Sequence, residues 1–241
     1  MKAILYIGHG TRSKKGAEEA KAFINRVMQR VVDVPIQEIS FLELTEPLIE
    51  DGFGRCVERG ATEIIVVPLF LLAAGHIKQD IPQVLASLRE KYPHIRVVVK
   101  DPFGVQERIL DAVAEIVTTV SNPLNPLDRL LIVGRGSSDP SILDDFVRIQ
   151  NGLKERLGLE EVSVCYLAAA EPRLQEGLNT VLEKTSGNII VVPYLLFSGL
   201  LSVEVSREVQ KWKRQGRSIS VTEPLSRHQV IEDVVMERAT L

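Results

Sequence analysis

The sequence has 241 residues, of which 45% are hydrophobic and 25% are charged, with a formal net charge of -3. These values are typical of a protein with a buried core, and the small negative charge gives no reason to expect a nucleic-acid partner. There is no run of 18 apolar residues and no cleavable leader pattern, so neither a membrane span nor export is predicted, and a cytoplasmic location is expected. Cys56 and Cys165 form no CxxC pair, so we expect two buried, inert thiols.

Short apolar runs rich in β-branched residues alternate with amphipathic stretches along the first half of the chain. The runs predict strands at 3–8, 36–44, 63–72 and 95–101, and the stretches predict helices at 13–32, 47–59, 78–92 and 106–120. Near-continuous apolar strands separated by helices are typical of parallel strands that are buried on both faces. The first half therefore predicts a doubly wound α/β unit.

The same pattern then starts again in the second half. After "NPLNPLD" at 122–128, which has the composition of a linker, "RLLIVGRGSSDP" repeats "AILYIGHGTRSK" and "GNIIVVPYLLF" repeats "TEIIVVPLFLL". The offset is 126 residues between Gly8 and Gly134 and 125 between Pro68 and Pro193. This constancy indicates an internal duplication. We predict two similar doubly wound parallel-sheet lobes, at residues 1–121 and 122–241.

Features that occur in both halves are attributed to the lobe itself. The glycines of the first turn are expected to serve a sharp strand-to-helix connection, a Glu-Pro pair to start a helix, and a strand-end proline to be scaffold. These shared positions are Gly8 and Gly10 (Gly134 and Gly136), Glu46–Pro47 (Glu171–Pro172) and Pro68 (Pro193).

Three positions break the symmetry of the duplication. His9 aligns with Arg135, Glu43 with Ala168, and His76 with Leu201, or with Leu200 if a one-residue gap precedes it. His9, Glu43 and His76 all lie at or just beyond the carboxyl ends of predicted parallel strands, where open α/β sheets bind their ligands. Two imidazoles and a carboxylate suit a divalent metal. On its own, Glu43 fits a salt bridge across the crevice equally well. His94 and His228 are expected to be solvated.

The segments "GHGTR", "SFLELTEP" and "PLFLLAAGHIKQDIP" resemble the class II, ATP-independent tetrapyrrole chelatases, in particular the bacillus-type sirohydrochlorin ferrochelatases. The resemblance runs along the whole chain. It implies two lobes that face each other across a macrocycle-binding cleft, with the active-site residues in one lobe. Carried over, those residues are His9, Glu43 and His76. The end "MERATL" has neither the histidine-rich tail nor the cysteine motif of longer cobaltochelatases, which favours the short ferrochelatase type.

The activity implied by the resemblance is that of a lyase that inserts Fe²⁺ into sirohydrochlorin and releases two pyrrole protons. Neutral histidine can bind the ion and accept a proton at neutral pH, and Glu43 would be a third ligand or a proton acceptor. No permanently bound cofactor and no nucleotide are expected, since no GxxxxGK[ST] motif is present. Candidates to meet the carboxylates of the macrocycle are Arg12, Lys14, Lys78, Arg135, Ser137 and Ser138. Because both lobes belong to one chain, a monomer is expected.

Three other functions compete with this interpretation. Histidine phosphatases also end their first strand in a His-Gly pair, but they need an arginine directly before the histidine, where this chain has Gly8. A non-catalytic tetrapyrrole or metal carrier would use the same residues and differs only in turnover. Insertion of Co²⁺ or Ni²⁺ is open as well, because a His/His/Glu site does not sort these ions from Fe²⁺.

Overall fold

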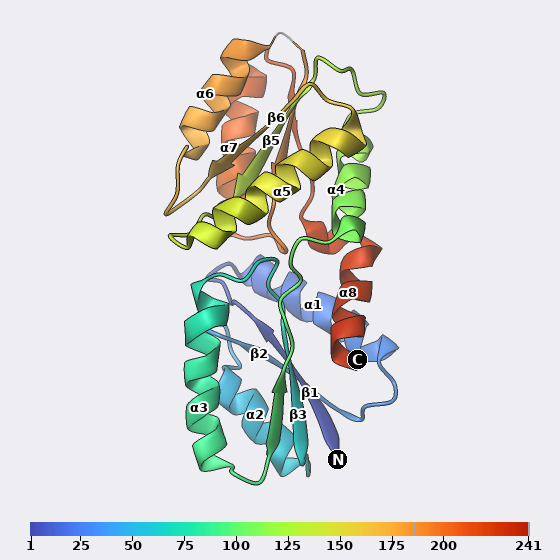
Figure 1. Cartoon of the computed structure of the whole chain (residues 1–241), viewed down its shortest axis with the longest axis vertical. Coiled ribbons are helices and arrows are strands. Elements are labelled where there is room, and N and C mark those ends of the chain that lie inside the picture. Colours follow the sequence, from blue (N-terminus) through green and yellow to red (C-terminus); the bar gives the residue numbers. More distant parts are fainter. Residues whose placement is uncertain (186, 241) are drawn as a thin grey trace. The chain divides into compact units, whose positions relative to one another are not determined.

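The computed structural model describes residues 1–185 and 187–240, apart from the side chain of His76. The chain divides into two compact units, of which unit 1 comprises residues 1–104 and 231–241 and unit 2 comprises residues 105–230. Each unit contains a four-stranded parallel sheet with helices on both faces (Figure 1). The predicted fold class, two similar doubly wound α/β lobes, is confirmed.

Unit 1 has the strand order β2-β1-β3-β4. Three predicted strands end early: β2 stops at Phe41 instead of residue 44, β3 at Pro68 instead of residue 72, and β4 at Val99 instead of residue 101. The segments that follow them form the turns at the carboxyl edge of the sheet. The elements are β1 (Lys2–Gly8), α1 (Lys14–Arg30), β2 (Ile36–Phe41), α2 (Ile49–Glu58), β3 (Glu63–Pro68), the π-helical turn η1 (His76–Asp80), α3 (Ile81–Lys91), β4 (Arg96–Val99) and, after unit 2, α8 (Gln229–Thr240).

Unit 2 repeats this topology with the strand order β6-β5-β7-β8. Pro193 ends β7 as Pro68 ends β3, which confirms that both prolines belong to the scaffold. The elements are α4 (Glu107–Val120), β5 (Arg129–Gly134), α5 (Pro140–Leu157), β6 (Glu161–Tyr166), α6 (Leu174–Lys184), β7 (Ile189–Pro193), α7 (Leu200–Arg214), β8 (Ile219–Val221) and the 3₁₀ turn η2 (Leu225–Arg227).

The core of each unit follows from the apolar runs of its central strand. Residues 3–7 of β1 and 130–133 of β5 are all fully buried. In unit 1, Ala3, Leu5 and Ile7 of β1 form one cluster with the apolar residues of α2 and α3. Because side chains alternate across a strand, the intervening Ile4 and Tyr6 face the other side, which α1 and α8 cover (Figure 1). Central strands that are apolar on both faces are thus covered by helices on both faces.

The last helix of each repeat packs in the unit formed by the other repeat. Arg26 of α1 donates to Glu232 of α8 at 2.7 Å, and Arg156 of α5 donates to Asp111 of α4 at 2.6 Å. The compact units therefore divide at residues 104/105 and 230/231, whereas the two repeats of the sequence meet near residue 122. Both helices bury apolar residues, Ile109 and Val113 on α4 and Ile231 and Val235 on α8, but the spacing of these residues does not say which sheet each helix covers.

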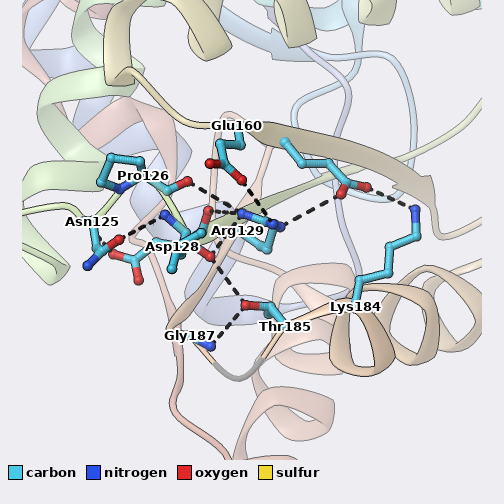
Figure 2. Close-up of polar contacts among 10 residues, drawn as sticks. Asn125, Pro126, Asp128, Arg129, Glu160, Lys184, Thr185 and Gly187 are labelled. Carbon is cyan, nitrogen blue, oxygen red and sulfur yellow. Dashed lines mark hydrogen bonds and ion pairs between the residues drawn. The ribbon is translucent and has the colours of Figure 1, made fainter.

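The segment 122–128, which has the composition of a linker, is tied into unit 2. The carboxylate of Asp128 accepts the Asn188 N–H at 3.1 Å and the Asn125 N–H at 3.0 Å. Arg129 donates to the carbonyl oxygen of Leu127 at 2.9 Å and lies 3.6 Å from the Glu160 carboxylate. Figure 2 shows the contacts of Asn125, Asp128, Arg129 and Glu160 at the start of β5. The segment is therefore held against unit 2 by hydrogen bonds where it enters β5, and it is not a flexible linker.

The Glu-Pro pairs do not start helices as predicted. Pro47 follows a cis peptide bond and lies before α2, whose first residue is Ile49, and Pro172 is placed in the same way before α6. The Pro47 carbonyl oxygen accepts the Phe41 N–H at 2.9 Å, and that of Pro172 accepts the Tyr166 N–H at 2.9 Å. Each pair thus closes the turn that follows an edge strand, because its carbonyl takes up the last N–H of that strand.

Both cysteines are free and buried, as predicted. Burial raises the pKa of the Cys56 thiol to about 12 and that of the Cys165 thiol to about 12. Because the thiolate is the reactive form, both thiols are protonated and inert at pH 8. We expect Ellman's reagent to label neither thiol in the folded protein and both after unfolding in guanidinium chloride. Stoichiometric labelling of the folded protein at pH 8 would contradict this.

Candidate functional site

The first turn of unit 1 brings His9 against the turn that follows β2. Gly10 has a φ of 95°, and a Cβ atom added there would lie 1.6 Å from the carbonyl oxygen of Glu43. Only glycine permits this approach. The Glu43 N–H donates to the carbonyl oxygen of His9 at 3.1 Å. The two turns are therefore in direct backbone contact at the carboxyl edge of the sheet.

Unit 2 contains the same pair of turns with other side chains. Gly136 has a φ of 89°, and a Cβ atom there would lie 1.7 Å from the carbonyl oxygen of Ala168. The Ala168 N–H donates to the carbonyl oxygen of Arg135 at 2.8 Å. The alignment of His9 with Arg135 and of Glu43 with Ala168 is thus an equivalence of backbone geometry. The interpretation of these glycines as turn residues is confirmed.

The side chains of His9 and Glu43 lie close together. His9 Nε2 is 3.7 Å from Glu43 Oε1, and the side chains are 24% and 49% exposed, respectively. The apolar neighbours of Glu43 predicted that it lies on a buried strand. It does not, because β2 ends at Phe41. It therefore needs no partner to offset burial. Its exposure and its distance from the imidazole leave it accessible to a ligand from solvent.

The contacts of the His9 ring indicate which nitrogen carries the proton. Nδ1 lies 3.1 Å from the carbonyl oxygen of Gly10, which can only accept a hydrogen bond. Nδ1 therefore donates, and in the neutral ring the lone pair is on Nε2, the atom nearest Glu43. An ion bound at about 2.0–2.2 Å by each group would bridge nitrogen and oxygen atoms at the observed separation. The Phe70 ring, with its centroid 6.1 Å from that of His9, borders the site.

His76 begins the π-helical turn η1, after the loop that follows β3. Its side chain lies outside the described part of the structure, so its approach to His9 and Glu43 stays a prediction. Single π-helical turns often occur at functional sites. Among the side chains that the structure does describe, no three His, Cys, Asp or Glu residues are grouped so that they could hold a metal ion. A three-ligand site at this edge therefore depends on His76.

The basic and hydroxyl candidates divide between the units. Arg12 and Lys14 are exposed at the start of α1, and Lys78 is exposed in η1, all near the carboxyl edge of the sheet of unit 1. Arg135 and Ser138 are exposed in the first turn of unit 2. The hydroxyl of Ser137 accepts the Asp139 N–H at 3.1 Å, so it also stabilises this turn.

Of the histidines expected to be solvated, His94 is exposed, but His228 is not. The His228 side chain is 20% exposed, and its Nε2 lies 2.9 Å from the Glu115 carboxylate. Its Nδ1 accepts the Val230 N–H at 3.3 Å, beside the start of α8. The prediction for His228 was wrong because Glu115, distant in sequence, supplies its partner.

Sequence reasoning missed two residues at this site, Phe70 and Thr45. Phe70 belongs to an apolar run that reads as strand, but it lies beyond the end of β3. The Thr45 hydroxyl bonds to the backbone of Thr11 on the neighbouring turn. No periodicity signals a side-chain contact with the backbone of a residue 34 positions away.

None of the described helices is long and apolar enough to cross a bilayer.

The model of the CbiX family matches residues 3–120 and again residues 129–240, in agreement with the duplication. The chain is 43% identical to the sirohydrochlorin ferrochelatase of Priestia megaterium, over 95% of this chain and 85% of that protein. It is 30% identical to the sirohydrochlorin cobaltochelatase of the same organism, over 99% of this chain and 79% of that protein. The structure of SirB from Bacillus subtilis with Fe³⁺ superimposes with a TM-score of 0.86 at 41% identity, covering 98% of this chain and 93% of that one.

Proposed function

Because the chain belongs to the CbiX family, we propose that it is a sirohydrochlorin ferrochelatase in which His9, Glu43 and His76 hold the incoming metal ion. The reaction inserts Fe²⁺ into sirohydrochlorin, giving sirohaem and two protons. The observation that carries the assignment of the site is the 3.7 Å separation between His9 Nε2 and Glu43 Oε1. The ion and the macrocycle are both substrates.

The side chains can serve both halves of this reaction. The lone pair on His9 Nε2, fixed by the Gly10 carbonyl, is available to coordinate Fe²⁺. The carboxylate of Glu43 can complete the coordination or accept a proton that leaves a pyrrole nitrogen. An ion that must pass to the macrocycle requires an open site with exchangeable positions. The partial exposure of both side chains meets this requirement.

The carboxylates of sirohydrochlorin need cationic partners. Arg12, Lys14 and Lys78 supply positive charge around the turn of His9 in unit 1. In unit 2 the candidates are Arg135, Ser137 and Ser138. Arg135 occupies the backbone position that corresponds to His9, so this unit keeps the shape of the turn and exchanges a metal ligand for an anion-binding group.

Replacement of Arg135 by alanine is expected to weaken substrate binding more than turnover. An exposed arginine–carboxylate contact formed equally in the ground and transition states raises KM and leaves kcat unchanged when it is lost. We expect KM for sirohydrochlorin to rise about 3- to 10-fold, from a loss of about 1 kcal/mol. Steady-state kinetics of Arg135→Ala measure the effect, with Arg148→Ala on α5 as the control variant. An unchanged KM in Arg135→Ala would count against the contact.

Turnover with Fe²⁺ tests the proposed function itself. The protein is mixed anaerobically with sirohydrochlorin and Fe²⁺, and the absorbance change on metal insertion is compared with the spontaneous reaction. A ferrochelatase accelerates this change at substoichiometric protein, whereas a carrier binds sirohydrochlorin without accelerating it. Hydrolysis of a generic phosphomonoester, with no effect on metal insertion, would instead support a phosphatase.

Cobalt insertion is the second candidate, favoured by the 30% identity to a cobaltochelatase. Histidine and carboxylate ligands do not exclude Co²⁺ or Ni²⁺, which bind such sites more tightly than Fe²⁺ does. Parallel assays with the three ions rank them by kcat/KM. The absence of a permanently bound cofactor, the monomeric state, the cytoplasmic location and the macrocycle-binding cleft stay predictions.

A further inference from the structure

The hydroxyl group of Thr45 bonds to both backbone groups of one residue on the neighbouring turn. It accepts a hydrogen bond from the Thr11 N–H at 2.9 Å and donates one to the Thr11 carbonyl oxygen at 2.9 Å. Both threonines are half-buried. We refer to this reciprocal pair of hydrogen bonds as the Thr45 clamp.

The clamp lies beside the pair of side chains assigned to metal binding. Thr11 follows His9 by two residues, and Thr45 follows Glu43 by two residues. The two turns are thus joined at one point by the hydrogen bond from the Glu43 N–H to the His9 carbonyl and at a second point by the clamp. Between these points lies Leu44, whose φ of 62° is one that residues other than glycine adopt rarely.

Unit 2 shows that the lobe does not need the clamp in order to fold. Ser137 and Ala170 occupy the positions of Thr11 and Thr45, and Ala170 has no hydroxyl group. The backbone hydrogen bond between Ala168 and Arg135 still forms, and Ala169 has a φ of 53°, close to that of Leu44. The turns therefore reach the same shape without a clamp. In this chain the clamp accompanies the histidine and the glutamate.

We propose that Thr45 is a positioning residue that holds the Glu43 turn against the His9 turn, so that the carboxylate stays within reach of an ion on His9. This inference rests on the proposed function. The Glu43 side chain is 49% exposed, so its position depends largely on that of its own backbone. Groups that orient metal ligands from outside the coordination sphere typically change metal affinity or activity by about 10- to 100-fold when they are removed.

The test compares four variants. Thr45→Val keeps the shape of the side chain and removes both hydrogen bonds, whereas Thr45→Ser keeps the hydroxyl group. Thr62→Val is the matched control, because the Thr62 hydroxyl likewise bonds to both backbone groups of one residue. It accepts from the Met1 amino group at 2.6 Å and donates to the Met1 carbonyl oxygen at 3.3 Å, at the opposite edge of the same sheet. His9→Ala is included to report on the metal site itself.

Two readouts separate positioning from general stability. Co²⁺ alone is titrated into each variant and followed by its visible absorption, and kcat and KM are measured with sirohydrochlorin and Fe²⁺. We expect Thr45→Val to bind Co²⁺ about 10-fold more weakly and to lose a similar factor in kcat, with KM for sirohydrochlorin nearly unchanged. Thr45→Ser and Thr62→Val are expected to stay close to the original protein in both assays.

Three other results would contradict the positioning role of Thr45. If Thr45→Val binds Co²⁺ and turns over like the original protein while His9→Ala binds Co²⁺ weakly, the positioning role is wrong and the metal site stands. If Thr62→Val loses as much affinity as Thr45→Val, the effect is general destabilisation and the proposal is overturned. If His9→Ala also keeps full Co²⁺ affinity, the assignment of the site fails, and the role of Thr45 fails with it.

Discussion

Replacement of His9 by alanine is expected to reduce metal insertion to near the spontaneous rate. The change removes the lone pair of Nε2 that faces Glu43 and leaves the backbone of the turn intact. Groups that only orient a metal ligand cost about 10- to 100-fold in metal affinity or activity when they are removed, and loss of the ligand itself should cost at least as much. We therefore expect kcat/KM to fall at least about 100-fold. The measurement is the initial rate of the absorbance change with Fe²⁺, after subtraction of the spontaneous reaction.

The matched control for this prediction is His94→Ala. His94 is an exposed histidine of the same unit, in the turn between α3 and β4. Its removal changes composition and surface charge in the same way but does not touch the carboxyl edge of the sheet. The assignment of the site is contradicted if His9→Ala retains turnover close to that of His94→Ala. Equal losses in both variants would indicate an effect on folding.

Replacement of Gly10 by alanine is expected to have the largest effect on stability. The new Cβ atom would lie 1.6 Å from the Glu43 carbonyl oxygen, and the φ of 95° is unfavourable for alanine. The overlap can be relieved only if the two turns move apart. Backbone strain and overpacking together give an expected loss of about 2–4 kcal/mol in the free energy of unfolding. Denaturant unfolding followed by circular dichroism measures it.

Two other glycines separate the causes of this effect. Gly60→Ala places alanine at a φ of 86° with nothing within 4 Å, so it reports the conformational cost alone. Gly136→Ala meets the Ala168 carbonyl oxygen at 1.7 Å in unit 2, so it repeats both costs away from His9 and Glu43. We expect Gly136→Ala to match Gly10→Ala in lost stability. In the fraction of each variant that remains folded, turnover is expected to fall further in Gly10→Ala than in Gly136→Ala. A stability loss in Gly10→Ala no greater than in Gly60→Ala would refute the steric explanation.

The sequence alone determined the fold class and the region of the candidate site. Apolar runs of strand length, separated by amphipathic stretches, are local patterns that depend on neighbours within a few positions. The repeat at an offset of about 125 residues showed that this pattern occurs twice. Comparison of the repeats selected His9 and Glu43, which lie together at the carboxyl edge of one sheet. Their equivalents, Arg135 and Ala168, have the same backbone contact.

Only the tertiary structure decided which groups meet across long stretches of chain. It placed α8 beside α1 through Glu232 and Arg26, and it paired His228 with Glu115. It also showed Glu43 in an exposed turn and the Thr45 hydroxyl on the backbone of Thr11. The physical reason is the same in each case. Periodicity fixes which face of an element is apolar, but the partner of that face, or of one polar side chain, is set by how the whole chain packs.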